Sequence, residues 1–190
     1  MPNVISTTAN GTAVYPISDA LLSKRKLFLT EQVDAESMNT LLQELMYLEQ
    51  TEPGKEITLF INSPGGECLS GLAVADYIKM MKSPVRTVCT GTAASMGAIL
   101  FLCGKKREML AHTKVMIHDP STQSAFNGMK PHEIEEQLSK LREMQDVLCD
   151  IISDVTGKPS KNIRRITKKD SFFGLKEAVK FGIATGEYKG

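Results

Sequence analysis

The sequence has almost no excess of charge of either sign. Its 23 Lys and Arg residues oppose 22 Asp and Glu residues, which leaves a formal net charge of +1 over 190 residues. Domains that bind nucleic acid usually carry a clear basic excess or a basic stripe. The basic runs here are short, such as Lys24-Arg25-Lys26 and Lys168-Lys169, and we interpret them as solvated surface. Nucleic acid is therefore not expected as a partner.

Cysteine and histidine are scarce and show no pattern typical of metal ligands. The chain has four cysteines and three histidines, with no CxxC pair and no Cys/His spacing of a zinc site. No metal and no cofactor is expected in this chain. The cysteines lie in apolar or glycine-rich segments, which predicts reduced packing residues and a cytoplasmic location. They are Cys68, Cys89, Cys103 and Cys149.

Long apolar runs, targeting signals and repeats are missing too. No apolar run approaches the ~18 residues of a membrane span. The start, MPNVISTTANGTAVY, lacks the basic and apolar regions of a signal peptide. No P-loop occurs, so ATP hydrolysis is not expected of this chain. The length suits one domain with a sizeable core.

What the sequence does contain is a regular alternation of strand-like and helix-like segments. Asp34, for example, is a plausible N-cap for a helix whose apolar residues recur every three or four positions. Such alternation predicts an α/β fold with a mainly parallel sheet and crossover helices. The predicted strands are 26–30, 56–61, 85–90, 107–110 and 114–117. The predicted helices are 34–49, 68–82, 95–103 and 131–155, with a short helix and a helix–strand unit, LKEAVKFGIA, after them.

Two segments are expected to lie outside the core. The helix 131–155 would be roughly 37 Å long, more than a compact domain of this size needs, so part of it should project and pack against a neighbour. Residues 1–16 are polar and threonine-rich, and we expect a mobile arm or a short hairpin there.

The stretch GTAASMGA surrounds Ser95 with small residues, where a predicted strand turns into a helix. This pattern is a variant of the G-x-S-x-G nucleophile elbow, in which the turn exposes the hydroxyl and the helix N-terminus offers N–H groups to an oxyanion. A plain helix cap is the alternative. A second strand-ending turn, Ser63-Pro64-Gly65-Gly66, could present backbone N–H groups to a carbonyl, or could be an ordinary glycine turn.

A serine nucleophile needs a base and an acid that orients the base. His118 ends the apolar strand KVMI and is favoured as base over His112, in a polar turn, and His132, in the first helical turn. The acid is left open. Neighbours on a strand point to opposite faces, which disfavours Asp119. The full set of acid candidates is Asp119, Asp150 and Asp154, the last two expected to be solvated, and Asp170, which precedes Phe172-Phe173 at an edge that could be buried.

Four segments, FINSPGGECLSGLAVADYI, GTAASMGAILF, KVMIHDP and DSFFGLKEAVKFGIA, resemble in order and spacing the motifs of the proteolytic subunits of the Clp protease (ClpP). The resemblance covers about residues 14–183. It implies the ClpP/crotonase fold and a serine endopeptidase with Ser95 as nucleophile, His118 as base and Asp170 as orienting acid. It also implies an oxyanion hole made by the N–H groups of Gly66 and Met96.

The resemblance further implies an assembly. Family members form heptameric rings that stack as a tetradecamer around a closed chamber, and they receive unfolded polypeptides from an AAA+ unfoldase that uses ATP. Residues 1–18 would be a flexible axial arm, and residues 19–190 one catalytic domain. The handle between rings would be about 119–156.

The chain departs from the family pattern at several positions. Asp119 stands where a glutamine follows the histidine, no Gly-Gly pair comes next, and a negative charge there favours protonated imidazole. Lys168-Lys169 replaces an acid and an arginine used in ring-to-ring ion pairs. Thr58 and Phe60 stand near positions where the family often has tyrosines in the unfoldase pocket. We therefore also consider a divergent subunit, weakly active or non-catalytic alone, that needs a second ClpP-type paralogue. A crotonase-like acyl-CoA enzyme is disfavoured because it would not need Ser95.

Overall fold

The computed structural model describes residues 2–8, 11–122 and 127–190. Within them a seven-stranded sheet has the order β3-β4-β5-β6-β9, with β7 paired to β5 and β8 paired to β7. Every pairing is parallel except β7–β8. The predicted α/β fold with a mainly parallel sheet is confirmed. The strands of this sheet are β3 (Lys26–Leu29), β4 (Ile57–Ser63), β5 (Val85–Ala94), β6 (Lys106–Met109), β7 (Lys114–Ile117), β8 (Ser171–Phe173) and β9 (Gly186–Glu187).

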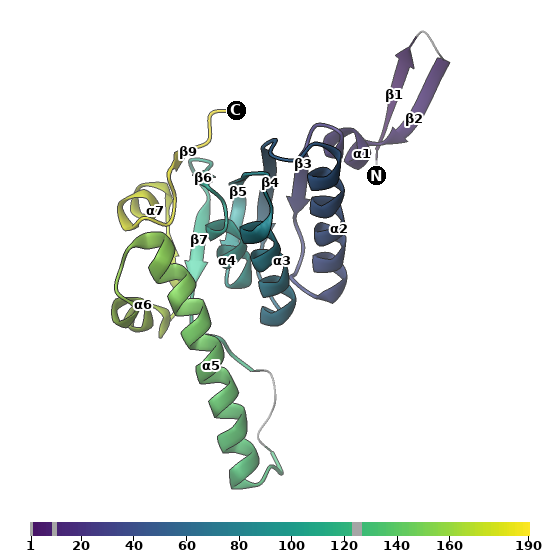
Figure 1. Cartoon of the computed structure of the whole chain (residues 1–190). Coiled ribbons are helices and arrows are strands. Elements are labelled where there is room, and N and C mark those ends of the chain that lie inside the picture. Colours follow the sequence, from purple (N-terminus) through teal and green to yellow (C-terminus); the bar gives the residue numbers. More distant parts are fainter. Residues whose placement is uncertain (1, 9–10, 123–126) are drawn as a thin grey trace.

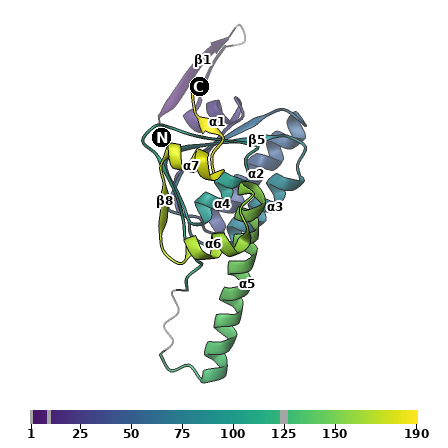
Figure 2. The same cartoon turned by 90° about the vertical axis from the view of Figure 1, so that its left-hand side faces the viewer.

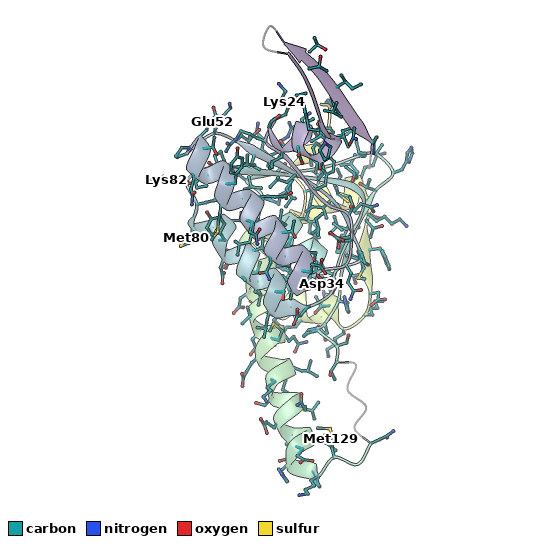
Figure 3. All side chains as sticks on the ribbon, turned by 90° about the vertical axis from the view of Figure 1, so that its right-hand side faces the viewer. Lys24, Asp34, Glu52, Met80, Lys82 and Met129 are labelled. Carbon is teal, nitrogen blue, oxygen red and sulfur yellow. The ribbon has the colours of Figure 1, made fainter. Side chains whose placement is uncertain are left out.

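Helices pack against this sheet and close the core (Figure 1). Helix α2 starts as predicted, because the Asp34 side chain accepts a hydrogen bond from the N–H of Ser37, and its buried residues recur every three or four positions. Figure 3 shows Asp34 at one end of this helix and Glu52 at the other. The helices are α1 (Ile17–Leu22), α2 (Ala35–Thr51), α3 (Cys68–Met80), α4 (Met96–Leu102), α5 (Pro131–Thr156), α6 (Ser160–Thr167) and α7 (Leu175–Phe181).

Strand β5 is longer than predicted and divides the sheet. Its first part, from Arg86 to Cys89, pairs with β6, and its last part, from Thr92 to Ala94, pairs with β7. The strand continues through the small residues from Thr92 to Ala94. In that stretch the sequence pattern does not distinguish a strand from a turn. As a result β5 delivers Ser95 to the carboxyl ends of β4 and β7, the edge at which α/β proteins commonly bind ligands.

Helix α5 projects from the body, as predicted (Figures 1 and 2). Its 26 residues correspond to about 39 Å, and its buried residues all lie near its C-terminal end. They are Leu148, Cys149, Ile151 and Ile152. Gly157 ends the helix in the left-handed conformation, with φ of 66°. Figure 3 shows Met129 at the outer tip of the projection. A helix face without a core beneath it is available to another chain.

At the opposite end, β1 (Asn3–Thr8) and β2 (Gly11–Pro16) form an antiparallel hairpin (Figure 2). Of the two expectations for this segment, the structure shows the hairpin. The domain boundaries and the role of an axial arm remain predictions. No helix in the described ranges is both long and apolar enough to cross a membrane.

The prediction that Lys24-Arg25-Lys26 is solvated surface was wrong for its central residue. Arg25 is only 4% exposed. Its guanidinium donates hydrogen bonds to three backbone carbonyl oxygens at the junction of α2 and β4, namely those of Leu48, Lys55 and Glu56. The carbonyls that hold the guanidinium are 23 to 31 residues away in sequence, so no local pattern marked it as buried.

Candidate active site

Ser95 sits on a strained turn between β5 and α4. Its φ of 53° and ψ of −122° are rare for a residue with a side chain, and its N–H donates to the carbonyl of Met116 at 2.9 Å. Strain of this kind persists only where the surrounding structure imposes it, and it is typical of functional sites. The hydroxyl makes no capping hydrogen bond to α4. The nucleophile-elbow geometry is therefore present, and a plain helix cap does not explain the serine.

The small residues around Ser95 are explained by the close approach of a second turn. Gly65 follows β4 with φ of +86°, and a Cβ built on it would lie 2.5 Å from the carbonyl oxygen of Ala94, 2.7 Å from the Ser95 Cβ and 2.8 Å from the Met96 N. On the other side, a Cβ on Gly97 would lie 3.2 Å from the carbonyl oxygen of Ser63. The two turns thus touch backbone to backbone, as the glycines of both stretches allow.

His118 follows β7 and shares an open cleft with Ser95. The cleft has a volume of about 500 Å³ and is also lined by the turn from Pro64 to Glu67. Both residues also line a narrow pocket that runs inward toward the base of α5. No hydrogen bond joins Ser95 to His118 in the described ranges; such bonds are often long in a site without substrate. The structure therefore brings the predicted nucleophile and base to the same surface.

Asp170 and His118 lie just beyond the paired ends of β8 and β7, and no hydrogen bond joins these two described residues. The antiparallel ladder of β7 and β8 ends with Ile117 opposite Ser171, so the next residue on each strand is His118 on one side and Asp170 on the other. Asp170 is exposed rather than at a buried edge. The ladder thus brings the backbone of Asp170 close to that of His118, while the residue itself is exposed.

The remaining candidates are placed as follows. His112 and His132 are exposed, in a turn and at the far end of α5. Asp150 and Asp154 are exposed on α5, as expected. Asp119 and His118 both line the narrow pocket, whereas only His118 also lines the open cleft. Strand β7 ends at Ile117, so the alternation of strand side chains does not extend to them.

Two backbone N–H groups near Ser95 are candidates for holding an oxyanion. The turn from Pro64 to Glu67, called the glycine turn below, is fixed by two backbone hydrogen bonds. The N–H of Val33 donates to the carbonyl of Gly65, and the N–H of Glu67 donates to the carbonyl of Val33. In the part of the chain that the structure describes, no acceptor is recorded for the N–H of Gly66 or for that of Met96, the first residue of α4. Unpaired donors at a strand-end turn and a helix N-terminus are the elements of an oxyanion hole.

The thiols near the site are poor nucleophiles. All four cysteines are free. Burial raises the pKa of Cys68, which lines the narrow pocket, and the nearby Glu67 carboxylate raises it further. Burial raises the pKa of Cys103 to about 11. Since the thiolate is the reactive form, the raised pKa values make these thiols poor nucleophiles. The described residues include no group of three or more His, Cys, Asp or Glu side chains able to hold a metal ion.

The fold and the site define an α/β protein with a serine elbow at the carboxyl ends of its parallel strands. The chain belongs to the Clp protease family, whose model matches residues 9–186. It is 35% identical over 185 residues to the ATP-dependent Clp protease proteolytic subunit of Deinococcus radiodurans, a match that covers 96% of this chain and 89% of that protein. The resemblance inferred from the four motifs is confirmed.

Sequence reasoning missed several residues that line the site. Gln32 borders the open cleft, and Gln145 and Thr167 border the narrow pocket. They come from a loop, from α5 and from the end of α6, and only the tertiary fold brings them to Ser95. No motif or spacing in the sequence could have identified them.

Proposed function

We propose that the chain is the serine endopeptidase subunit of a compartmentalised, ATP-dependent protease. The observation that carries this proposal is the strained turn that presents Ser95 in the same cleft as His118 and the unpaired N–H groups of Gly66 and Met96. Family membership supports it, and it favours a peptidase over an acyl-CoA enzyme.

The proposed reaction proceeds through an acyl-enzyme. His118 accepts the proton of Ser95, and the resulting alkoxide attacks the carbonyl carbon of a peptide bond. The N–H groups of Gly66 and Met96 hold the oxyanion, and His118 then protonates the leaving amine. A water molecule, deprotonated by His118, releases the new carboxyl end and restores Ser95. Asp170 would hold the imidazole in the required tautomer.

The proposed triad needs alignment, which we assign to assembly. In the isolated chain Asp170 is exposed, and no hydrogen bond in the described ranges links it to His118. We propose that heptameric rings stack into a tetradecamer through the projecting α5 and its neighbours. Lys168 and Lys169 are exposed beside Asp170, so stacking of identical rings would bring like charges together. A second, ClpP-type subunit with acidic residues there would favour mixed assembly and higher activity.

An AAA+ unfoldase would supply unfolded polypeptides to the chamber in the cytoplasm and would use the ATP. One surface of the sheet offers it an aromatic cluster, which consists of Phe28, Phe60 and Tyr188. The rings of Phe28 and Phe60 stack at 5.0 Å, Tyr188 lies edge-on to Phe60 at 5.9 Å, and Phe28 is 46% exposed. Exposed aromatic rings of this kind are typical of interaction surfaces.

The docking proposal predicts a selective defect. Replacing Phe28 with alanine should slow unfoldase-dependent degradation of a folded protein several-fold, because exposed aromatic side chains contribute strongly to interfaces. Hydrolysis of a short peptide, which enters without the unfoldase, should stay within about twofold. The two rates are measured on the same assembled sample. An equal loss of both would point to a damaged site and would contradict the docking role.

A fluorophosphonate probe tests the proposed function. Wild-type protein, alone and mixed with a second ClpP-type subunit, is expected to become labelled at Ser95, and Ser95→Ala is expected to abolish both labelling and peptide hydrolysis. Ser139→Ala, an exposed serine of α5, serves as the control and should label normally. Labelling only in the mixture supports a subunit that is weakly active alone. Absence of labelling in both assemblies, or turnover of CoA esters that survives Ser95→Ala, would exclude the peptidase.

A further inference from the structure

The narrow pocket beside Ser95 contains a carboxylate with an unpaired, buried oxygen. Oδ1 of Asp119 has no hydrogen-bond partner in the described ranges. The backbone N–H of Asp119 donates to the carbonyl of Thr167 at 2.7 Å, which fixes the residue in the pocket wall. The apolar part of the wall is formed by Met96, Ile99, Ile117, Leu148 and Ile152. A buried carboxylate oxygen without a partner is unfavourable, so its presence calls for a group that reaches it in the working protein.

Two cationic side chains around the pocket are already paired with carboxylates. Arg164 forms an ion pair with Asp146. Lys140 is the one Lys or Arg side chain among the described residues that line the cleft, the narrow pocket and the groove joining them, and it lies 2.7 Å from Glu136. Among the described residues that line these spaces, no Lys or Arg lacks a carboxylate partner, and Lys168, which follows Thr167 in sequence, is exposed.

A second carboxylate faces the same path. Glu67 follows the proposed oxyanion turn and lines both the open cleft and the adjoining groove. It is exposed and accepts a hydrogen bond from Ser70. Ser95 is therefore flanked by one carboxylate inside the narrow pocket and another at its mouth, and a cationic group approaching the cleft is attracted by both.

We propose that Asp119 makes this site select substrates with a lysine or arginine side chain on the residue whose carbonyl Ser95 attacks. The inference rests on the proposed peptidase function and adds its substrate class. Apolar walls suit the methylene stem of such a side chain, and the carboxylate at the side suits its charged head. Acidic side chains would be rejected, because two like charges would face them.

The size of the pocket decides how the charged head reaches Asp119. Its interior volume of about 20 Å³ has room for about one water molecule. The stem therefore enters between the apolar walls after the unbranched side chains of Met96 and Gln145 move aside, and the head then reaches Oδ1 directly or through one bridging water. Both residues line the pocket, and such side chains adapt more readily than branched ones.

The test compares three fluorogenic peptides that differ only in the residue before the cleaved bond: lysine, norleucine, which has a similar stem without the charge, or glutamate. With the assembled wild-type protein, kcat/KM is expected to be at least about tenfold higher for lysine than for norleucine and lowest for glutamate. Asp119→Asn keeps the shape and removes the charge, and it should reduce the lysine-to-norleucine ratio to near one. Asp154→Asn, which removes an exposed carboxylate on α5, is the matched control and should leave the ratio unchanged.

The ratio separates selection from catalysis. An effect of Asp119 on the protonation of His118 would scale all three peptides alike, so it would not move the ratio. In a second measurement, binding of the uncleaved lysine and norleucine peptides to Ser95→Ala protein is followed by fluorescence anisotropy, with and without Asp119→Asn. If the lysine-to-norleucine ratio of kcat/KM is the same in wild type and Asp119→Asn, the inference is overturned. Labelling of Ser95 by the fluorophosphonate would in that case still support the proposed function. Absence of labelling removes the proposed function, and the binding measurement still decides whether Asp119 selects a cation.

Discussion

Gly65→Ala is expected to abolish the reaction of Ser95 with a fluorophosphonate, whereas Gly54→Ala is expected to leave it intact. The two glycines have almost the same backbone conformation, with φ of +86° and +84°. A Cβ at position 65 would lie within 2.8 Å of three atoms of the Ala94–Met96 turn, while one at position 54 meets nothing within 4 Å. The pair therefore separates the strain of a left-handed alanine, which is common to both, from displacement of the serine turn.

The expected loss follows from geometry. To make room, the glycine turn and the serine turn must move apart, which displaces the N–H of Gly66 or Met96 from the position of the oxyanion. Loss of one such donor typically lowers the rate by about 10²–10³. Both variants should lose on the order of 1 kcal/mol for the strained backbone, and Gly65→Ala should lose more because its Cβ also displaces the neighbouring turn. Labelling rates and thermal melting of the two proteins provide the measurement. Equal labelling of both variants would show that the two turns do not need their close contact for reaction.

The placement of Ser95 and His118 at the strand ends could be predicted from sequence because it depends on local patterns. A strand followed by small residues and a helix predicts an elbow, and the end of an apolar strand fixes a histidine at the sheet edge. Asp119 shows the limit of such reasoning. The alternation of side chains holds only while the strand continues, and β7 ends two residues earlier. Its buried, unpaired carboxylate oxygen could not be predicted, because residues of α5 and α6, distant in sequence, form the pocket around it.

Helices and strands could likewise be predicted where residues close in sequence determine them, and not where tertiary pairing does. The start of α2 was predictable because Asp34 caps it locally, and the glycine at position 157 marked the end of α5. Helix α1 and strand β8 were not predicted from the sequence. No residue of α1 is buried, and β8 has three residues, one of them the exposed Phe172. Neither element shows a hydrophobic period, and β8 forms only because it pairs with β7.

Arg25→Met, which keeps a long unbranched side chain but removes the guanidinium, is expected to be strongly destabilising. Arg25 donates to the carbonyls of Leu48, Lys55 and Glu56 at 3.0, 2.8 and 3.2 Å, and so ties the end of α2 to the start of β4. Its contact with Glu52, at 3.9 Å, adds little because that carboxylate is half exposed. Hydrogen bonds from a charged donor contribute about 1.5–3 kcal/mol each, so the loss of three should cost about 4 kcal/mol or more.

Thermal unfolding of Arg25→Met is compared with that of two control variants, Arg25→Lys and Lys24→Met. For a domain of this length a loss of 4 kcal/mol lowers Tm by roughly 8–16 °C. Arg25→Lys retains the charge but not the planar fork that reaches several carbonyls, and it should recover less than half of the difference. Lys24→Met removes an exposed charge next in sequence and should change stability by less than about 0.5 kcal/mol. If Arg25→Met had the same Tm as Lys24→Met, water would hydrogen-bond the three carbonyls as well as the guanidinium does. The guanidinium would then not hold the end of α2 against the start of β4. If Arg25→Lys melted like wild type, the charge rather than the fork would be the stabilising feature.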